Sequence, residues 1–396
     1  MTENTITLHK GREKSVLLKH PWIFESAIKE FPKNLENGDT VIVEDHSKNK
    51  IAIASYSQFS KIRARIWTWD PTIIINAGFL KKRVEEAIER RKVYCDLKES
   101  NAQRLVFGEA DGLPGLIVDQ YRNTLVVQIL SVGPEHFRFE IFNILNDLTH
   151  PDQIFEKSDV DVRVLEGLEE RKGMIQGNAD EKIVEIYENG IKYRIDIENG
   201  QKTGFYIDQR RNRFKIQQIA QGRDVLNCFC YSGGFTLNAI AGNARSVVSV
   251  DSSATALEQL NENLKVNGFD FQKNNNIEGD VFKQLRLFRD QGKSFDLIIL
   301  DPPKFAPTVS QAEKASRGYK DINLLAIKLL RPGGILATFS CSGGISRELF
   351  QKIVTGAALD AGSEIRILDQ LSQSPDHPVA LNFPESFYLK GLICIK

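Results

Sequence analysis

The sequence predicts an α/β protein: a doubly wound parallel sheet, a β-rich module at the N-terminus and a β/α segment between them. From about residue 200, apolar strand-like runs alternate with helical segments. Residues 295–300 form an aliphatic run that stops at Asp301-Pro302-Pro303, as expected of a strand buried on both faces. Residues 1–75 instead carry short strands separated by polar turns.

Length and composition limit the classes of function. At 396 residues the chain is too long for one ordinary core, and we expect three parts: residues 1–75, 76–198 and 199–396. Lys and Arg (52) balance Asp and Glu (52), which excludes coating of nucleic acid by bulk charge but permits a local basic face. Five cysteines without a Cys-x-x-Cys pair favour a reduced, cytoplasmic protein with no metal site. No signal peptide or membrane-spanning run is visible, so we expect no membrane partner.

The N-terminal part is predicted to be a small β module. Residues 38–45 and 51–55 read as a hairpin, and residues 61–69 read as a further strand that carries Arg63 and Arg65. One interpretation of these arginines is a half-buried strand with a solvated charged face. The other is an RNA-docking surface in which basic and aromatic side chains meet backbone and bases.

The middle part mixes strands and helices. We expect helices over residues 79–97 and 134–148, and strands over residues 104–107, 115–118, 124–130, 183–187 and 191–197. In the last part we expect strands over residues 225–229, 247–250, 295–300 and 334–340, with a short strand closed by Gly279-Asp280. One helix is expected to end at residue 241, and three others are expected over residues 254–266, 322–330 and 346–361. Two strands are expected after the last helix.

Three acids, Asp251, Asp280 and Asp301, stand at the ends of three successive strands of the predicted sheet, and they favour a nucleoside cofactor. A glycine loop, Tyr231-Ser-Gly-Gly-Phe235, opens a helix and lets the backbone approach a ligand. Asp251 ends the next strand, where an acid can accept the hydroxyls of a ribose. Asp280 and Val281 could read an adenine edge. S-adenosylmethionine fits these features together, although each single acid could instead be a helix N-cap.

Asp301 and Cys341 supply the expected chemistry. An acid followed by two prolines can hold the amine and N3 region of a nucleobase, which indicates a nucleobase methyltransferase without naming the atom. Cys341 closes the strand expected beside that of Asp301 and would face the same cleft. C5 of a pyrimidine needs a thiolate at C6 before it takes a methyl group, so Cys341 favours cytosine C5. The alternative is a small buried core cysteine.

Five motifs in order resemble one family over essentially the whole chain. They are Lys202-Thr-Gly-Phe-Tyr-Ile-Asp-Gln-Arg210, Asn227-Cys-Phe-Cys-Tyr-Ser-Gly-Gly-Phe235, Asp301-Pro-Pro-Lys-Phe305, Arg317-Gly-Tyr-Lys-Asp-Ile-Asn323 and Phe339-Ser-Cys-Ser-Gly343. The chain resembles bacterial 23S ribosomal RNA cytosine-C5 methyltransferases of the RlmI type. The resemblance implies a PUA-like module, a central segment and a class I methyltransferase domain. It also implies 23S rRNA, or an assembling large ribosomal subunit, as substrate. A homodimer is compatible with the sequence.

The motifs and the resemblance together name the expected site. The expected catalytic residues are Cys341 and Asp301. The residues expected at S-adenosylmethionine are Lys202, Tyr206, Asp208, Gln209, Asn227, Phe229, Ser232, Gly233, Gly234, Asp251, Ser252, Asp280, Val281 and Asp301, with the first four at its methionine end. Those expected at the RNA are Pro302, Pro303, Lys304, Arg317, Lys320, Arg63 and Arg65. Related cytosine methyltransferases carry a second cysteine beside the proline motif, where this chain has Pro303-Lys304.

Two alternative functions stay open at this point. One is an RNA methyltransferase that acts on a guanine or an exocyclic amine, with Cys341 as a bystander. The other is a non-catalytic RNA-binding factor of ribosome assembly that retains the fold.

Overall fold

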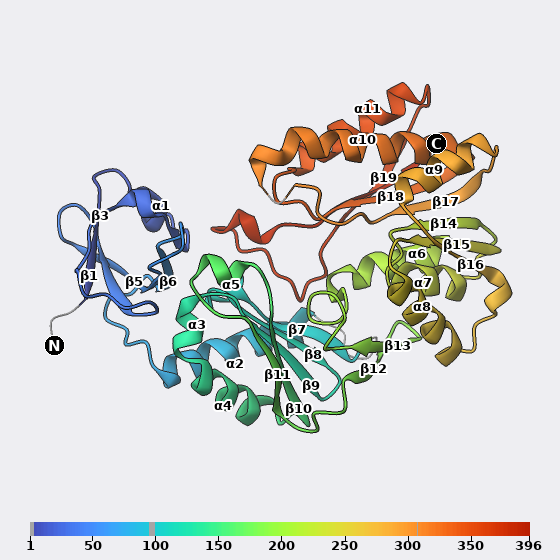
Figure 1. The fold of residues 1–396 in the computed structure, drawn as a ribbon. Coiled ribbons are helices and arrows are strands. Elements are labelled where there is room, and N and C mark those ends of the chain that lie inside the picture. Colours follow the sequence, from blue (N-terminus) through green and yellow to red (C-terminus); the bar gives the residue numbers. More distant parts are fainter. Residues whose placement is uncertain (1–3, 95–99, 307) are drawn as a thin grey trace. The chain divides into compact units, whose positions relative to one another are not determined.

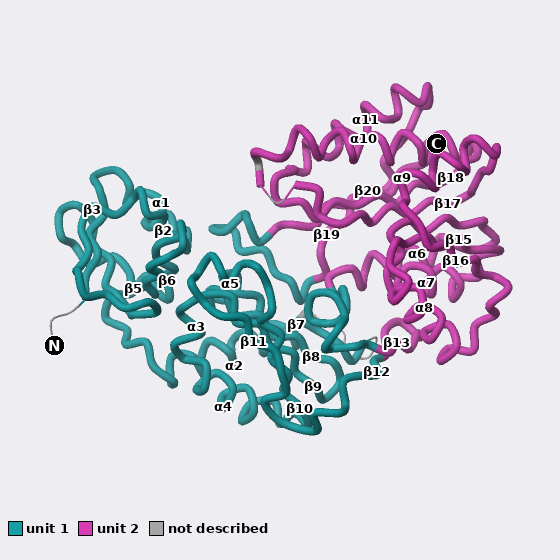
Figure 2. Tube along the Cα trace, in the orientation of Figure 1, with its two compact units in different colours: residues 1–186, 195–207, 375–386 teal, residues 187–194, 208–374, 387–396 magenta. Residues whose placement is uncertain are grey.

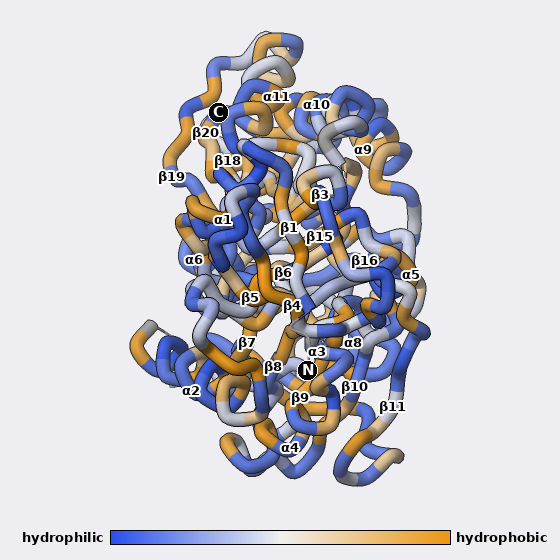
Figure 3. The backbone as a smooth tube through the Cα atoms, turned by 90° about the vertical axis from the view of Figure 1, so that its left-hand side faces the viewer, coloured by the Kyte–Doolittle hydropathy of each residue, from blue (hydrophilic) through white to orange (hydrophobic). Residues whose placement is uncertain are grey.

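The computed structural model describes residues 4–94, 100–306 and 308–396. The chain forms two compact units (Figure 2). Unit 1 comprises residues 1–186, 195–207 and 375–386, and unit 2 comprises residues 187–194, 208–374 and 387–396. Hydrophobic stretches alternate with hydrophilic ones along the backbone of both units (Figure 3). The end of the helix expected over residues 79–97 lies outside the described residues.

The N-terminal module of unit 1 is a six-stranded sheet. Its elements are β1 (Thr5–Leu8), α1 (Lys14–Leu17), β2 (Trp22–Ile23), the 3-10 turn η1 (Glu25–Ala27), β3 (Ile28–Glu30), β4 (Thr40–Glu44), β5 (Lys50–Tyr56) and β6 (Ala64–Thr68). The strand order is β2-β6-β5-β4-β1-β3. The predicted hairpin is β4 and β5, which pair antiparallel with Ile42 opposite Ile53. Val41 and Val43 alternate into a core that also holds Ile6 and Ile66.

The second sheet of unit 1 is five-stranded. Its elements are α2 (Ala77–Tyr94), β7 (Ala102–Phe107), η2 (Gly108–Asp111), β8 (Leu116–Tyr121), β9 (Thr124–Ile129), α3 (Val132–His136), α4 (Arg138–Thr149), β10 (Gln153–Ser158), α5 (Val162–Leu165) and β11 (Arg171–Gln176). The strand order is β11-β10-β9-β8-β7. Helix α2 packs Leu80, Val84 and Ala87 into the core of this sheet, as their helical spacing predicts. Strands β10 and β11 were not predicted.

A segment late in the sequence also belongs to unit 1. The carboxylate of Asp376 accepts the backbone N–H of Arg104 at 3.1 Å, and its carbonyl accepts the guanidinium of Arg91 at 3.0 Å. The ring of Phe383, just before the 3-10 turn η6 (Pro384–Ser386), meets that of Trp22 edge-on. Residues 375–386 are therefore held by buried arginines and by aromatic packing.

Unit 2 is a seven-stranded sheet with helices on both faces (Figure 1). The hairpin β12 (Ile183–Glu188) and β13 (Ile191–Asp196) and the turn η3 (Ile207–Gln209) precede it. Its elements are α6 (Arg210–Ile219), β14 (Asp224–Cys228), α7 (Gly234–Ala241), β15 (Ser246–Asp251), α8 (Ala254–Val266), η4 (Phe271–Lys273), β16 (Asn274–Glu278), α9 (Val281–Asp290), β17 (Phe295–Leu300), η5 (Val309–Gln311), α10 (Ala312–Leu329), β18 (Leu330–Ser340), α11 (Arg347–Asp360), β19 (Arg366–Ser372) and β20 (Lys390–Ile395). The strand order is β16-β15-β14-β17-β18-β20-β19.

Strand β17 lies in the middle of this sheet. Its residues 297–300 are fully buried, as an aliphatic strand between two helical layers must be. It pairs parallel with β14 on one side and with β18 on the other, so that Leu300 lies between Cys228 and Thr338. The expectation that the strands of Asp301 and Cys341 are neighbours is confirmed. Strand β20 then adds antiparallel to β18, with Lys390 opposite Ser340.

Helix α10 begins ten residues before the predicted start at Ile322, at Ala312. Most of the extra residues are polar, and among them Ala315 and Tyr319 are buried one helical turn apart. Gly318 obscured the pattern because glycine is a poor helix former. A Cβ atom there would stand 3.5 Å from the ring of Phe305, an ordinary contact.

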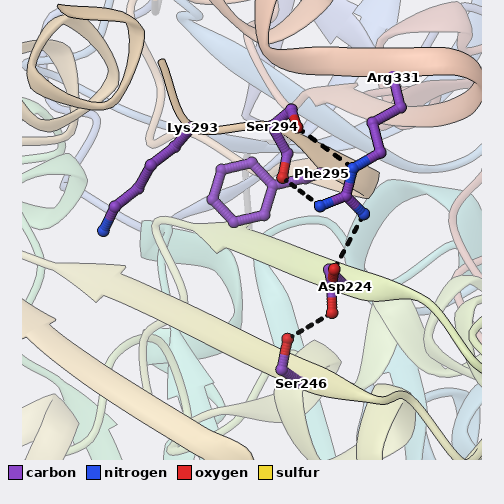
Figure 4. Close-up of a pocket in the computed structure, with 6 residues that line it drawn as sticks. All are labelled: Asp224, Ser246, Lys293, Ser294, Phe295 and Arg331. Atoms are coloured by element: carbon purple, nitrogen blue, oxygen red, sulfur yellow. Dashed lines mark hydrogen bonds and ion pairs between the residues drawn. The ribbon is translucent and has the colours of Figure 1, made fainter. Parts of the chain in front are cut away.

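The amino edge of the sheet holds a network of ion pairs around a shallow pocket of about 360 Å³ (Figure 4). Asp224 accepts hydrogen bonds from Arg245 at 2.7 Å, from Ser246 at 2.8 Å and from Arg331 at 2.9 Å. Asp296 joins through Arg331 at 2.7 Å. These side chains stand at the starts of β14, β15, β17 and β18, so the network ties those strands together. It lies opposite the carboxyl edge, where open α/β sheets bind ligands.

Candidate active site

The carboxyl edge of the sheet in unit 2 brings the chemistry-bearing residues to neighbouring strand ends. Asp251 is the last residue of β15, Asp301 follows β17, and Cys341 follows β18. The strands β15, β14, β17 and β18 are adjacent and parallel, so their carboxyl ends share one edge. This edge is the candidate active site.

The glycine loop between β14 and α7 has an unusual backbone. Phe229, Tyr231 and Gly233 all have positive φ, at 59°, 47° and 85°. A Cβ atom on Gly233 would lie 2.6 Å from Cγ of Leu260, so this position requires glycine both for its φ and for its packing. Ser232 is buried, and its carbonyl accepts the amide of Asn263 at 3.1 Å. The loop is thus shaped by its own backbone and held by α8.

Asp251 is oriented by two backbone amides. One carboxylate oxygen accepts the N–H of Tyr231 at 2.8 Å, and the other accepts the N–H of Ser253 at 3.0 Å. Each oxygen retains acceptor capacity, because a carboxylate oxygen has two lone pairs. The half-buried carboxylate can therefore accept the hydroxyls of a ribose without moving. Ser252, next in the chain, is exposed.

Asp280 acts as a helix cap. Its side chain accepts the N–H of Lys283 at 2.9 Å, which is the N-cap bond of α9. The strand before it, β16, ends at Glu278, two residues earlier than predicted. Val281 is buried as the first residue of α9. The capping interpretation of Asp280 is therefore observed, and adenine recognition by Asp280 and Val281 stays a prediction.

Gln209 lies against Asp301. Its side-chain N–H donates to the carboxylate of Asp301 at 3.1 Å, and its own oxygen accepts Asn212 at 2.6 Å. Gln209 is buried and Asp301 is half-buried, and the hydrogen bond between them orients the carboxylate. The neighbouring Asp208 is buried as well and accepts the hydroxyl of Tyr388 at 2.5 Å.

The other residues expected around the cofactor have structural contacts. Asn227 is fully buried in β14 and donates to the hydroxyl of Thr236 on α7 at 2.9 Å. Lys202 has a φ of 53°, and its ammonium lies 4.2 Å from the ring centre of Tyr206. The hydroxyl of Tyr206 donates to Gln201 at 2.6 Å. Lys202 and Tyr206 belong to unit 1, and their place at a cofactor stays a prediction.

Ser342 connects the motif that contains Cys341 with the motif that begins at Asp301. Its hydroxyl oxygen accepts the backbone N–H of Phe305 at 3.1 Å and that of Ala306 at 3.0 Å, and it lies 2.9 Å from the hydroxyl of Tyr319. The loop that carries Cys341 is thereby tied to the turn that follows Asp301. Cys341 is half-buried, whereas Cys228, Cys230 and Cys394 are buried. In that turn Pro302 is buried, and Pro303 and Lys304 are exposed.

Lys390 is a residue that the motifs did not identify. Its side chain is buried with 3% exposure, and its ammonium donates to the carbonyls of Ser342 at 2.7 Å and Tyr388 at 2.8 Å. Burial lowers the pKa of Lys390 to about 8, although a thiolate at Cys341 acts in the opposite direction. The signal was present in the sequence, because Lys390 opens a strand that is otherwise apolar.

The basic residues expected at RNA fall into two groups. Arg317 and Lys320 lie on α10 and pair with Glu313 and Asp360, each at 2.8 Å, near solvent. Arg65 is buried with 6% exposure and pairs with Glu166 at 2.8 Å, while Arg63 pairs with Glu25 at 2.6 Å. Arg65 is therefore buried in an ion pair instead of lying on a solvated charged face, and a contact of Arg63 or Arg65 with RNA stays a prediction.

Residues 4–94, 100–306 and 308–396 contain no group of three or more His, Cys, Asp or Glu side chains that could hold a metal ion. Nor does any helix in this part of the chain have the length and apolarity to cross a membrane.

Comparison with known proteins identifies the family. Residues 173–382 match the model of S-adenosylmethionine-dependent methyltransferases, and residues 6–69 match that of PUA-like domains. Proteins named ribosomal RNA large subunit methyltransferase I are 48% identical in Aeromonas salmonicida and 44% identical in Cronobacter sakazakii, over 98% of both chains in each case. A methyltransferase solved with SAH has the same fold, with a TM-score of 0.87, 20% identity and full coverage of both chains. The chain therefore belongs to the S-adenosylmethionine-dependent methyltransferases with a PUA-like domain that include the ribosomal RNA large subunit methyltransferases I.

Proposed function

We propose that this protein methylates C5 of a cytosine in the ribosomal RNA of the large subunit, through a covalent bond between Cys341 and C6 of the base. The observation that carries the proposal is the connection made by Ser342, which fixes Cys341 beside the turn of Asp301. The names of relatives at 44% to 48% identity support large-subunit rRNA as the substrate. The half-buried state of Cys341 supports its role as nucleophile, because the other described cysteines are buried.

The residues at the carboxyl edge fit S-adenosylmethionine. The oriented carboxylate of Asp251 suits the ribose, and the loop before α7 suits the charged end of the methionine. Asp280 and Val281 would border the adenine, while Lys202, Tyr206, Asp208 and Gln209 would border the methionine. When bound, S-adenosylmethionine supplies the electrophilic methyl group that C5 takes.

The side chains of the protein would make C5 reactive. The thiolate of Cys341 adds to C6, and the carboxyl group of Asp301 hydrogen-bonds N3 and delivers a proton there. This addition moves electron density to C5 and makes it nucleophilic. After methylation, an unassigned base removes the C5 proton, and the electron pair of that C–H bond expels the thiolate from C6. N3 returns its proton to the Asp301 carboxylate, which restores the ring. Gln209 holds the carboxyl group of Asp301 in place for its contact with N3.

The RNA would reach this edge as a flipped-out base. Pro302, Pro303 and Lys304 would form the platform beside the base, and Arg317 and Lys320 would contact phosphates. The PUA-like module would hold a neighbouring part of the rRNA. The ion pair of Arg317 is highly exposed, so exchange of its carboxylate partner for a phosphate costs little.

An RNA that contains 5-fluorocytosine tests this proposal. Fluorine at C5 cannot leave as a proton does, so the bond between Cys341 and C6 persists and a protein–RNA adduct forms. We expect an adduct with the wild type and with Cys394→Ala, a buried-cysteine control, and none with Cys341→Ala. Methylation without any adduct would contradict the proposal and favour an amine-directed enzyme. Absence of S-adenosylmethionine binding in calorimetry would contradict it in favour of a non-catalytic factor.

A further inference from the structure

Lys390 lies beside both chain neighbours of Cys341, Ser340 and Ser342. In the antiparallel pair of β18 and β20 it stands opposite Ser340, the residue before the cysteine. Its ammonium donates to the carbonyl of Ser342, the residue after the cysteine, at 2.7 Å. A buried lysine is uncommon because the charged form loses its hydration.

We propose that Lys390 is a positioning residue that takes the proton of the Cys341 thiol, so that Cys341 meets the cytosine as a thiolate beside an ammonium ion. This inference rests on the proposed function, because it assigns the activation of that nucleophile. In the step, the S–H bond breaks and its electron pair stays on sulfur. The lone pair of the neutral Lys390 amine forms the new N–H bond.

The hydrogen bonds of Lys390 suit this exchange. An ammonium has three N–H donors, and two of them go to the carbonyls of Ser342 and Tyr388. Both bonds persist in the neutral amine, which still has two N–H groups. The third position on nitrogen can therefore hold or release a proton while the side chain stays where it is.

Burial and the charged groups around Lys390 determine its pKa. Burial lowers the pKa of Lys390 to about 8, close to the ordinary range of a thiol, so the proton can pass between the two groups. A thiolate at Cys341 raises that pKa, and the cation of Lys304, on the turn after Asp301, lowers it. From α10, the hydroxyl of Tyr319 faces the same loop, and burial raises its pKa, so it stays neutral. The hydroxyl of Tyr388 points to Asp208.

The alternative is that Lys390 only fastens strands together, and the chain contains a matched control for that role. Lys396 follows the other end of β20, and its ammonium also donates to two backbone carbonyls, those of Ile327 and Leu330, each at 2.8 Å. Burial lowers the pKa of Lys396 too. Lys396 therefore makes the same kind of structural hydrogen bonds as Lys390, but it lies at the opposite end of β20 from the residue that pairs beside Cys341.

Alkylation of Cys341 in the full-length protein tests the inference without RNA or cofactor. Iodoacetamide reacts with thiolates, so the rate at Cys341, followed by peptide mass spectrometry against pH, reports the thiolate fraction. We expect the midpoint for the wild type to lie about one pH unit or more below that of N-acetylcysteine. Lys390→Met should slow alkylation about tenfold near pH 7, whereas Lys396→Met should leave the profile unchanged.

Two results would overturn the inference. One is a wild-type midpoint equal to that of N-acetylcysteine, which needs no variant and so does not depend on whether Lys390→Met folds. The other is an equal shift in both lysine variants, which would leave only the fastening role. Failure of the proposed function is a separate result. If Lys390 controls alkylation but 5-fluorocytosine RNA gives no adduct, the result supports activation of Cys341 by Lys390 and contradicts the proposed covalent methylation of cytosine.

Discussion

The hydroxyl oxygen of Ser342 accepts the backbone N–H of Ala306 at 3.0 Å. This bond, with its companion to Phe305, joins the end of β18 to the turn after β17. Parallel pairing brings two strand ends to one edge, but it does not fix the loops that follow them. Ser342 fixes those loops, and the relative position of Cys341 and Asp301 depends on it.

Ser342→Ala should therefore lower both the rate of methyl transfer and the stability of the fold. Two backbone N–H groups lose their acceptor and the hydroxyl of Tyr319 loses a hydrogen-bond partner, at a cost of about 2 kcal/mol in the free energy of unfolding. Small displacements of reacting groups reduce kcat by about tenfold to a hundredfold. Tyr319→Phe is the matched control, because it removes one of the three contacts and should cost about 1 kcal/mol. Equal kcat in the wild type and Ser342→Ala, measured by methyl transfer to rRNA, would contradict this account.

Asp301→Asn should reduce kcat about a hundredfold, the usual effect of losing an acid–base group. The asparagine oxygen can still accept the hydrogen bond from Gln209, so the fold and the affinity for S-adenosylmethionine should change much less. Asp296→Asn, at the other end of β17, is the comparison. It alters the ion pairs of the amino edge, and methyl transfer per folded molecule should match that of the wild type. Similar kcat values for the two variants would count against a role of Asp301 in the reaction.

Gly233→Ala should destabilise the protein and weaken S-adenosylmethionine binding. Positive φ alone costs alanine about 1 kcal/mol, and the clash with Leu260 should raise the total to about 3 kcal/mol. Gly268→Ala isolates the first effect, since Gly268 has a φ of 64° and nothing within 4 Å of its Cβ position. Urea unfolding and calorimetry measure the two quantities. Identical losses of stability in the two variants would show that the packing against Leu260 is unimportant.

The amino-edge network should make stability depend on pH in the acid range. The hydrogen bond from Arg245 holds the pKa of Asp224 well below its usual range. A carboxylate with a depressed pKa in the folded state stabilises it above the unfolded pKa, near 4, and this stabilisation is lost as the pH falls further. Asp224→Asn should therefore cost about 1 kcal/mol at neutral pH and progressively less below about pH 4.

Urea unfolding at several pH values measures this dependence. Asp290→Asn is the control, because the ion pair between Asp290 and Arg289 is exposed and joins adjacent residues. A constant difference between Asp224→Asn and the wild type at all pH values would rule out the electrostatic explanation.

Local patterns in the sequence predicted much of unit 2. The aliphatic run of β17, the prolines after it and the alternation of strands and helices all arise from short-range rules. The adjacency of β17 and β18 followed from the usual strand order of this fold class, and the pairing confirms it. Asp251, Asp301 and Cys341 were predicted as site residues because strand ends carry function in such sheets, and the structure places all three at strand ends.

The features that the sequence did not predict depend on tertiary contacts. Arg65 looked exposed in an alternating strand, but Glu166, about a hundred positions away, makes its burial possible. Ser342 and Lys390 stood in the sequence as an ordinary serine and an isolated lysine. The role of Ser342 depends on its hydrogen bonds to the turn after β17, and that of Lys390 depends on the pairing of β18 with β20. Neither long-range contact can be read from local periodicity.

The most direct test of the central claim is the formation of 5-methylcytosine by Cys341→Ala on large-subunit rRNA from a strain that lacks this protein. Nucleoside mass spectrometry measures the product, and calorimetry confirms that the variant still binds S-adenosylmethionine. We predict cofactor affinity like that of the wild type and no 5-methylcytosine, with Cys394→Ala as active as the wild type. Formation of 5-methylcytosine by Cys341→Ala would contradict the covalent mechanism.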